Sequence, residues 1–175
     1  SATFLKFMHR NLSYETSFLS AIGAIEQKFP VAGLIAVGGS TRSWQSMALE
    51  AMAATMFTTS LKVVDMILAK RVPAPAQCLL NDNLIKRAHK LGNNIIDAIL
   101  TSPEKREWLG EKGFGWCPNC HSNALIKGEV QWDGTYWPIE CQVCGAGGDL
   151  EKDENGEWKF VIAKDGLSRD RTTDE

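Results

Sequence analysis

Two runs of almost unbroken apolar residues, 31–37 and 61–69, dominate the hydrophobic pattern of the chain. Such runs are typical of strands in a parallel sheet that is covered on both faces. Segments with helical spacing of apolar residues surround them, at 3–11, 14–27, 44–57 and 83–100. This alternation of helices and strands predicts an α/β fold with right-handed parallel crossovers.

A sheet of two strands would be incomplete, because both of its outer edges would stay unpaired. We therefore expect either that another chain supplies strands or that the front of this domain is missing.

The helix predicted at 83–100 has two distinct sides. An apolar side is expected to face the sheet and consists of Leu84, Ala88, Leu91, Ile95, Ile96 and Ile99. A second side gathers His89 with Lys86, Arg87 and Lys90. We expect this second side to lie in water.

The composition changes near residues 109–114. Residues 1–110 carry 12 Lys/Arg and 8 Asp/Glu, and residues 111–175 carry 7 and 13, so the charge balance passes from +4 to −6. Four of the five cysteines also lie in the second part. These shifts predict two domains, 1–110 and 111–175.

The second part has the pattern of a small β unit. Short β-prone pieces lie at 125–132, 136–140 and 158–162, with turn signals at Asp133–Gly134 and Asn155–Gly156. Four tryptophans are predicted to form the core of this unit: Trp116, Trp132, Trp137 and Trp158.

Two Cys-x-x-Cys pairs form the sharpest motif in the sequence, with 20 residues between the pairs. The four cysteines are Cys117, Cys120, Cys141 and Cys144. Each pair can aim two thiolates at one ion, and the spacing is within the range of four-thiolate zinc sites. Gly145 follows the second pair, where such a turn commonly needs a positive φ. We predict a structural zinc ribbon.

The cysteine pattern is compatible with three other kinds of site. Cys117 to His121 also satisfies the c-type haem pattern, but that interpretation leaves the second pair unused. A thioredoxin-like redox pair would need a βαβ context at the motif. A rubredoxin-like iron site uses the same four thiolates, so the choice between zinc and iron stays open. His121 is expected near the metal but outside its ligand set, or at the surface.

The acidic second part argues against nucleic acid as a partner, since phosphate binding needs the opposite charge. The chain contains no apolar run of transmembrane length, so no membrane partner is expected. Cysteines arranged for a metal rather than for disulfides point to the cytoplasm.

The glycine pair Gly38–Gly39 follows the first apolar run directly. Glycines at the carboxyl end of a strand permit a tight turn and a close approach of backbone to a ligand. Ser40 and Thr41 are candidate N-caps for the helix that begins near Trp44. The free N–H groups at such a helix start favour anionic or electron-rich ligands.

Taken in order, these segments resemble the flavodoxin-like NAD(P)H-dependent FMN reductases and iron–sulfur flavoproteins. "SATFLKFMHR" is similar to a helix of that family, with His9 where the family usually has Asp. "GLIAVGGSTRSWQSMALEAM" resembles its next strand and a Gly-Gly loop followed by a Gln, here Gln45. "LIKRAHKLGNNIIDAI" is similar to its final helix, and the tail to a zinc-ribbon extension with a Ser-Arg near its end, here Ser168–Arg169.

The resemblance implies the fold class: part of a flavodoxin-like parallel sheet with flanking helices, followed by a small β zinc ribbon. It also implies FMN at the carboxyl ends of the strands. The family's phosphate-binding loop and its iron–sulfur cysteines belong to a segment that would precede Ser1. The flavin contacts carried over by the resemblance are Gly38, Gly39, Ser40, Thr41, Arg42, Trp44, Ser1 and Ala2.

The function implied by the resemblance is that of an FMN-dependent NAD(P)H oxidoreductase that passes electrons to a flavin, a quinone or another acceptor. The family further implies a homo-oligomer. No catalytic residue is assigned. The alternative is a non-catalytic zinc-binding interaction module on an α/β scaffold, which the missing phosphate loop favours.

Overall fold

The computed structural model describes residues 30–41, 47–57, 61–74 and 76–169, together with Lys6, Leu19, Ile22 and Gly23. The chain divides into two compact units, Ser1–Glu111 and Lys112–Glu175. The helices expected at 3–11 and 14–27, and the start of the one expected at 44–57, lie outside the described residues.

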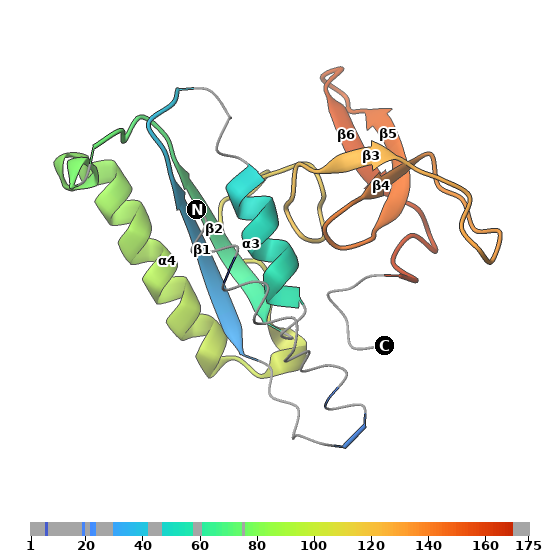
Figure 1. Cartoon of the computed structure of the whole chain (residues 1–175), viewed down its shortest axis with the longest axis horizontal. Coiled ribbons are helices and arrows are strands. Elements are labelled where there is room, and N and C mark those ends of the chain that lie inside the picture. Colours follow the sequence, from blue (N-terminus) through green and yellow to red (C-terminus); the bar gives the residue numbers. More distant parts are fainter. Residues whose placement is uncertain are drawn as a thin grey trace. The chain divides into compact units, whose positions relative to one another are not determined.

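The first unit contains the two predicted strands, β1 (Val31–Val37) and β2 (Lys62–Ala69). They pair in parallel, as predicted. The helices α3 (Met47–Phe57) and α4 (Asp82–Leu100) lie on opposite sides of this strand pair in Figure 1. Short 3₁₀ helices, η3 (Gln77–Leu80) and η4 (Pro103–Lys105), flank α4. The described part of this unit is therefore a mixed α/β layer structure with a two-stranded parallel sheet.

One cluster of the core of the first unit lies between β2 and α4. Ile67, Ala69 and Leu91 form a buried cluster, against which Val72, Leu84, Ala88 and Ile95 pack. The two remaining members of the predicted apolar side, Ile96 and Ile99, are mostly exposed. That part of the prediction is wrong because the buried side of α4 turns toward Asn94 and Ala98, which are both buried.

Arg87 also departs from the sequence prediction. It was grouped with the solvated residues of α4, yet its guanidinium forms an ion pair with Asp65, a completely buried carboxylate in the middle of β2. Its Nε donates to Glu111 at 3.0 Å. Its neighbours Lys86 and His89 are exposed, as predicted. Arg87 therefore ties α4 to both the sheet and the segment that follows the helix.

Asn81 begins α4 as an N-cap. Its backbone is extended, and its side-chain oxygen accepts a hydrogen bond from the Leu84 N–H at 3.1 Å. Such a bond satisfies one of the N–H groups that a helix start leaves without an intrahelical partner.

We expect Asn81→Ala to lower the free energy of unfolding of the first unit by about 1 kcal/mol, since alanine cannot replace the capping oxygen. The urea concentration at which the amides of α4 lose half of their protection from hydrogen exchange measures this loss. Asn93→Ala is the control, because Asn93 lies exposed within the same helix, where alanine is the better helix former. Equal midpoints for the two variants would contradict a capping role.

The second unit is a four-stranded antiparallel sheet in the order β3-β4-β5-β6. Its strands are β3 (Leu125–Lys127), β4 (Ile139–Cys141), β5 (Gly147–Lys152) and β6 (Trp158–Ile162). The strand predicted at 158–162 is confirmed, whereas those predicted at 125–132 and 136–140 are short and shifted. The turn predicted at Asn155–Gly156 joins β5 to β6, with Gly156 at φ 79°.

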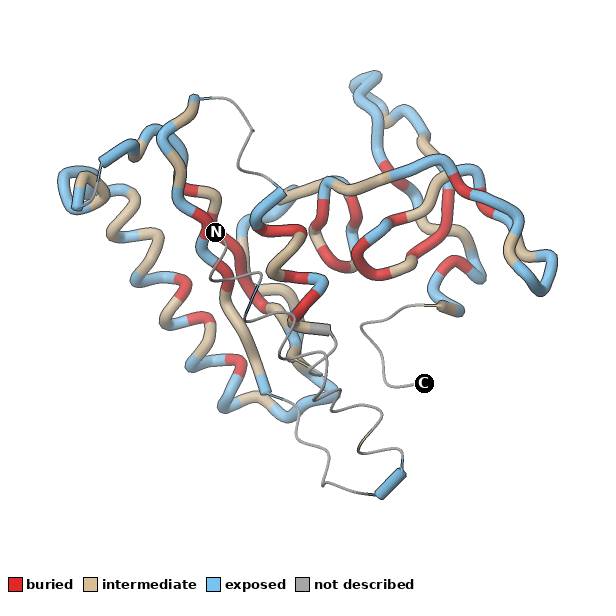
Figure 2. The backbone as a smooth tube through the Cα atoms, in the orientation of Figure 1, coloured by how far each residue is buried: buried red, intermediate tan, exposed pale blue. Residues whose placement is uncertain are grey.

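The tryptophan prediction is wrong for three of the four residues. Trp137 is 4% exposed, but Trp116, Trp132 and Trp158 are exposed. The other buried apolar residues of this unit are the four cysteines with Val143, Ala146 and Phe160, and Figure 2 shows the buried segments of the backbone in red. The core thus combines the cysteine cluster with two aromatic rings, Trp137 and Phe160.

No helix within the described ranges is both long enough and apolar enough to cross a membrane.

Candidate metal centre and strand-end loop

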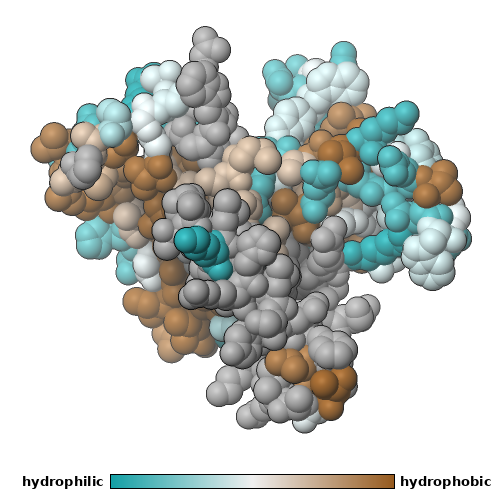
Figure 3. Space-filling view, in the orientation of Figure 1, coloured by the Kyte–Doolittle hydropathy of each residue, from teal (hydrophilic) through white to brown (hydrophobic). Residues whose placement is uncertain are grey.

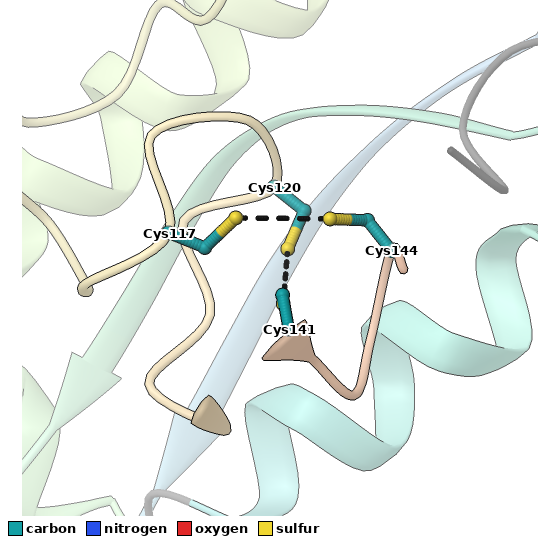
Figure 4. Close-up of side chains that lie close together, drawn as sticks. All are labelled: Cys117, Cys120, Cys141 and Cys144. Atoms are coloured by element: carbon teal, nitrogen blue, oxygen red, sulfur yellow. Dashed lines mark hydrogen bonds between the residues drawn. The ribbon is translucent and has the colours of Figure 1, made fainter. Parts of the chain in front are cut away.

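Two similar turns carry the four cysteines. In the first, the His121 N–H donates to the Cys117 carbonyl at 2.8 Å, and in the second the Gly145 N–H donates to the Cys141 carbonyl at 2.9 Å. Gly145 has a φ of 88°, which confirms the predicted positive φ after the second pair, and His121 at the same position of the first turn has a φ of 60°. Each turn therefore folds back so that both of its thiols point inward (Figure 4).

The thiols converge on one point. All four Sγ atoms lie within 4.8 Å of one another, and all four residues are buried. The Sγ atoms of Cys117 and Cys144 are 3.7 Å apart, and those of Cys120 and Cys141 are 3.5 Å apart. Zinc–sulfur bonds of 2.3 Å in a tetrahedron place sulfur atoms about 3.8 Å apart. The cluster can therefore hold one metal ion such as zinc.

A frame of backbone hydrogen bonds holds the two turns together. The carbonyl of the buried Ser122 accepts from the N–H groups of Trp116 and Cys117, and its Oγ accepts from the Ala124 N–H. The Ala124 carbonyl in turn accepts from the Gln142 N–H in the second turn. Sequence reasoning did not identify Ser122, because a lone serine next to His121 carries no motif.

The thiols strongly affect one another's protonation. Hydrogen bonds from the neighbouring thiols, first from Cys117, raise the pKa of Cys120 and lower the pKa of Cys141. Four thiolates packed this closely would repel one another without a cation between them. A divalent ion held by the cluster would supply that charge. His121 is half-buried and belongs to no metal-binding cluster found in the described residues, as expected.

The glycine loop lies at the carboxyl end of β1, as predicted, but its backbone is engaged within the chain. The Gly38 N–H donates to the Ala69 carbonyl at 2.9 Å, and the Gly38 carbonyl accepts from the Val72 N–H at 3.0 Å. A Cβ on Gly39 would lie 2.8 Å from Pro73. The close approach that glycine permits here is to the chain's own loop after β2.

Of the other six residues of the expected flavin contact set, two lie within the described residues. Ser40 is half-buried and its carbonyl accepts from the Arg71 N–H at 3.2 Å, while Thr41 is exposed. The remaining four, Arg42, Trp44, Ser1 and Ala2, lie outside the described residues.

Comparison with known proteins yields one curated relative. No protein-family model matches the chain, and no solved structure matches it significantly. The chain is 29% identical over 140 residues to a protein named flavone synthase cfoJ from Aspergillus candidus. The alignment covers 79% of this chain but 41% of that protein, so the chain spans about two-fifths of its relative. The chain is thus similar, at a distance, to part of an enzyme.

Proposed function

We propose that residues 112–175 form a zinc ribbon in which Cys117, Cys120, Cys141 and Cys144 hold one structural Zn²⁺. The convergence of four buried Sγ atoms within 4.8 Å carries this proposal. Four protein ligands fill a tetrahedral ion, which leaves no position for water or substrate. The role of the ion is therefore to stabilise the fold and not to activate a reactant.

For the activity of the whole protein, the proposal is an FMN-dependent NAD(P)H oxidoreductase that works as a homo-oligomer in the cytoplasm. The resemblance of the segments in order supports it, as does the similarity to an enzyme named flavone synthase. FMN accepts a hydride from NAD(P)H and passes electrons to an acceptor.

A non-catalytic interaction module remains a second candidate, because of the glycine loop. The Gly38 N–H and carbonyl are both bonded within the chain. The Gly38 N–H is therefore already engaged by the Ala69 carbonyl and is not a donor for a flavin.

Absorption spectroscopy and metal analysis of one freshly purified sample separate these proposals. We expect about one zinc per chain from a four-thiolate site. Flavin bands would support the oxidoreductase. Zinc without flavin would favour the interaction module, and absence of any metal would contradict the ribbon.

A further inference from the structure

The loop between β3 and β4, residues 128–138, presents three apolar side chains to water. It is the orange loop that extends away from the strands in Figure 1. Trp132 at its tip is 93% exposed, Val130 is 71% exposed and Tyr136 is about half exposed. A tryptophan in this position adds nothing to the core of the unit. Exposed aromatic residues of this kind are the side chains that most often anchor protein interfaces.

The loop has a defined conformation. The Gln131 N–H donates to the Thr135 carbonyl at 2.9 Å, and the Gly134 N–H donates to the Gln131 carbonyl at 2.9 Å. Asp133 pairs with Arg169. The Thr135 N–H and the Arg169 guanidinium together lower the pKa of Asp133 to about 2. A braced loop loses less conformational entropy on binding, which favours a preformed contact site.

An acidic sheet face is connected to this loop. The Gln131 side chain donates to Glu140 at 3.2 Å, and Glu140 pairs across the sheet with Ile126. Asp149 pairs with Val161. Because residues two apart on a strand share a face, the β4–β5 register puts both pairs on one side of the sheet. Exposed Ile126 and Val161 thus lie beside Glu140 and Asp149 on this face, which also carries the cross-strand pair Glu151 and Lys159.

The charge of the second unit selects the class of partner. Residues 112–175 contain 7 Lys/Arg and 12 Asp/Glu, a balance of −5. In the space-filling view of Figure 3, hydrophilic side chains surround isolated hydrophobic ones over the right-hand part of the surface. This charge disfavours nucleic acids and anionic lipids, and it favours a cationic protein segment.

We propose that loop 128–138 and the adjoining acidic face bind a Lys/Arg-containing segment of a partner protein, with Trp132 as the anchor. Cationic groups stack on the Trp132 ring and pair with Asp149 and Glu140, while Val130 and Tyr136 contact the aliphatic parts of the segment. This docking site stands whether or not the protein binds FMN.

Calorimetric titration of the full chain with a synthetic peptide of alternating arginine and leucine tests the proposal. We expect this peptide to bind and a peptide with glutamate in place of arginine not to bind. Trp132→Ala should raise the Kd by about tenfold or more, as for an interface anchor. Asp149→Asn should flatten the salt dependence of the Kd, and it serves as a second variant should Trp132→Ala fail to fold.

Trp158→Ala is the matched control. Trp158 is also an exposed tryptophan of the second unit, but it pairs with Lys152 on the opposite face of the sheet, and the Lys152 Nζ lies 5.2 Å from its ring centroid. Equal losses for Trp132→Ala and Trp158→Ala would overturn the proposal, as would absence of peptide binding. Trp132-dependent binding to phosphatidylcholine vesicles, or Trp132-dependent self-association in sedimentation, would overturn it in favour of a membrane or a second copy.

Discussion

Cys144→Ser should abolish stoichiometric zinc binding and unfold residues 112–175. Structural zinc sites contribute about 10–16 kcal/mol of apparent binding free energy, which is also folding free energy for a small domain. Apart from the cysteines, the buried apolar residues described in this unit are Trp137, Val143, Ala146 and Phe160. A core of that size cannot stabilise a domain of fewer than about 70–80 residues without disulfide bonds or a structural metal ion.

Hydrogen exchange followed by mass spectrometry measures this effect unit by unit. Amides of β4, β5 and β6 should lose protection in Cys144→Ser and after treatment of the wild-type chain with a strong chelator. Cys78→Ser is the matched control, since Cys78 lies in η3 of the first unit, outside the cluster. Retained protection of β5 and β6 in metal-free protein would show that the ion does not stabilise the fold.

The features that the sequence predicted well are those set by neighbouring residues. The continuous apolar run of β1, the Asn155–Gly156 turn and the Cys-x-x-Cys turns depend on local backbone geometry and on spacing. Even the convergence of the two cysteine pairs follows from a short connection between them. These features can therefore be predicted from the sequence without knowledge of the tertiary structure.

The features that were missed depend on contacts between distant residues. β5 begins with Gly147–Gly148, and its residues alternate only weakly between apolar and polar. It forms a strand because it pairs with β6. Trp132 is indistinguishable by type from Trp137, and only the fold decides which one is buried. Arg87 follows Lys86 in a polar run of a helix, and its partner Asp65 lies 22 residues away. Hydrophobic periodicity carries no information on such pairs.

Arg87→Met should lower the free energy of unfolding of the first unit by about 3–5 kcal/mol, the cost of leaving a buried charge without its partner. Asp65 is completely buried, and it accepts from Arg87 Nη1 at 2.8 Å and from Asn94 Nδ2 at 2.8 Å. Asn94 also donates to the Leu109 carbonyl. Loss of Arg87 therefore leaves the Asp65 carboxylate with one neutral donor in place of a guanidinium.

A double-mutant cycle distinguishes the buried charge from a simple packing defect. Asp65→Leu with Arg87→Met removes both charges, so we expect it to be more stable than Arg87→Met alone. Lys86→Met is the matched control, because Lys86 is exposed on the same helix and should change stability by less than about 0.5 kcal/mol. Urea titration read by exchange at β2 and α4 gives the free energies of unfolding of the wild type, Asp65→Leu, Arg87→Met, the double variant and the Lys86→Met control. If Arg87→Met were as mild as Lys86→Met, the ion pair would not stabilise the attachment of α4 to β2.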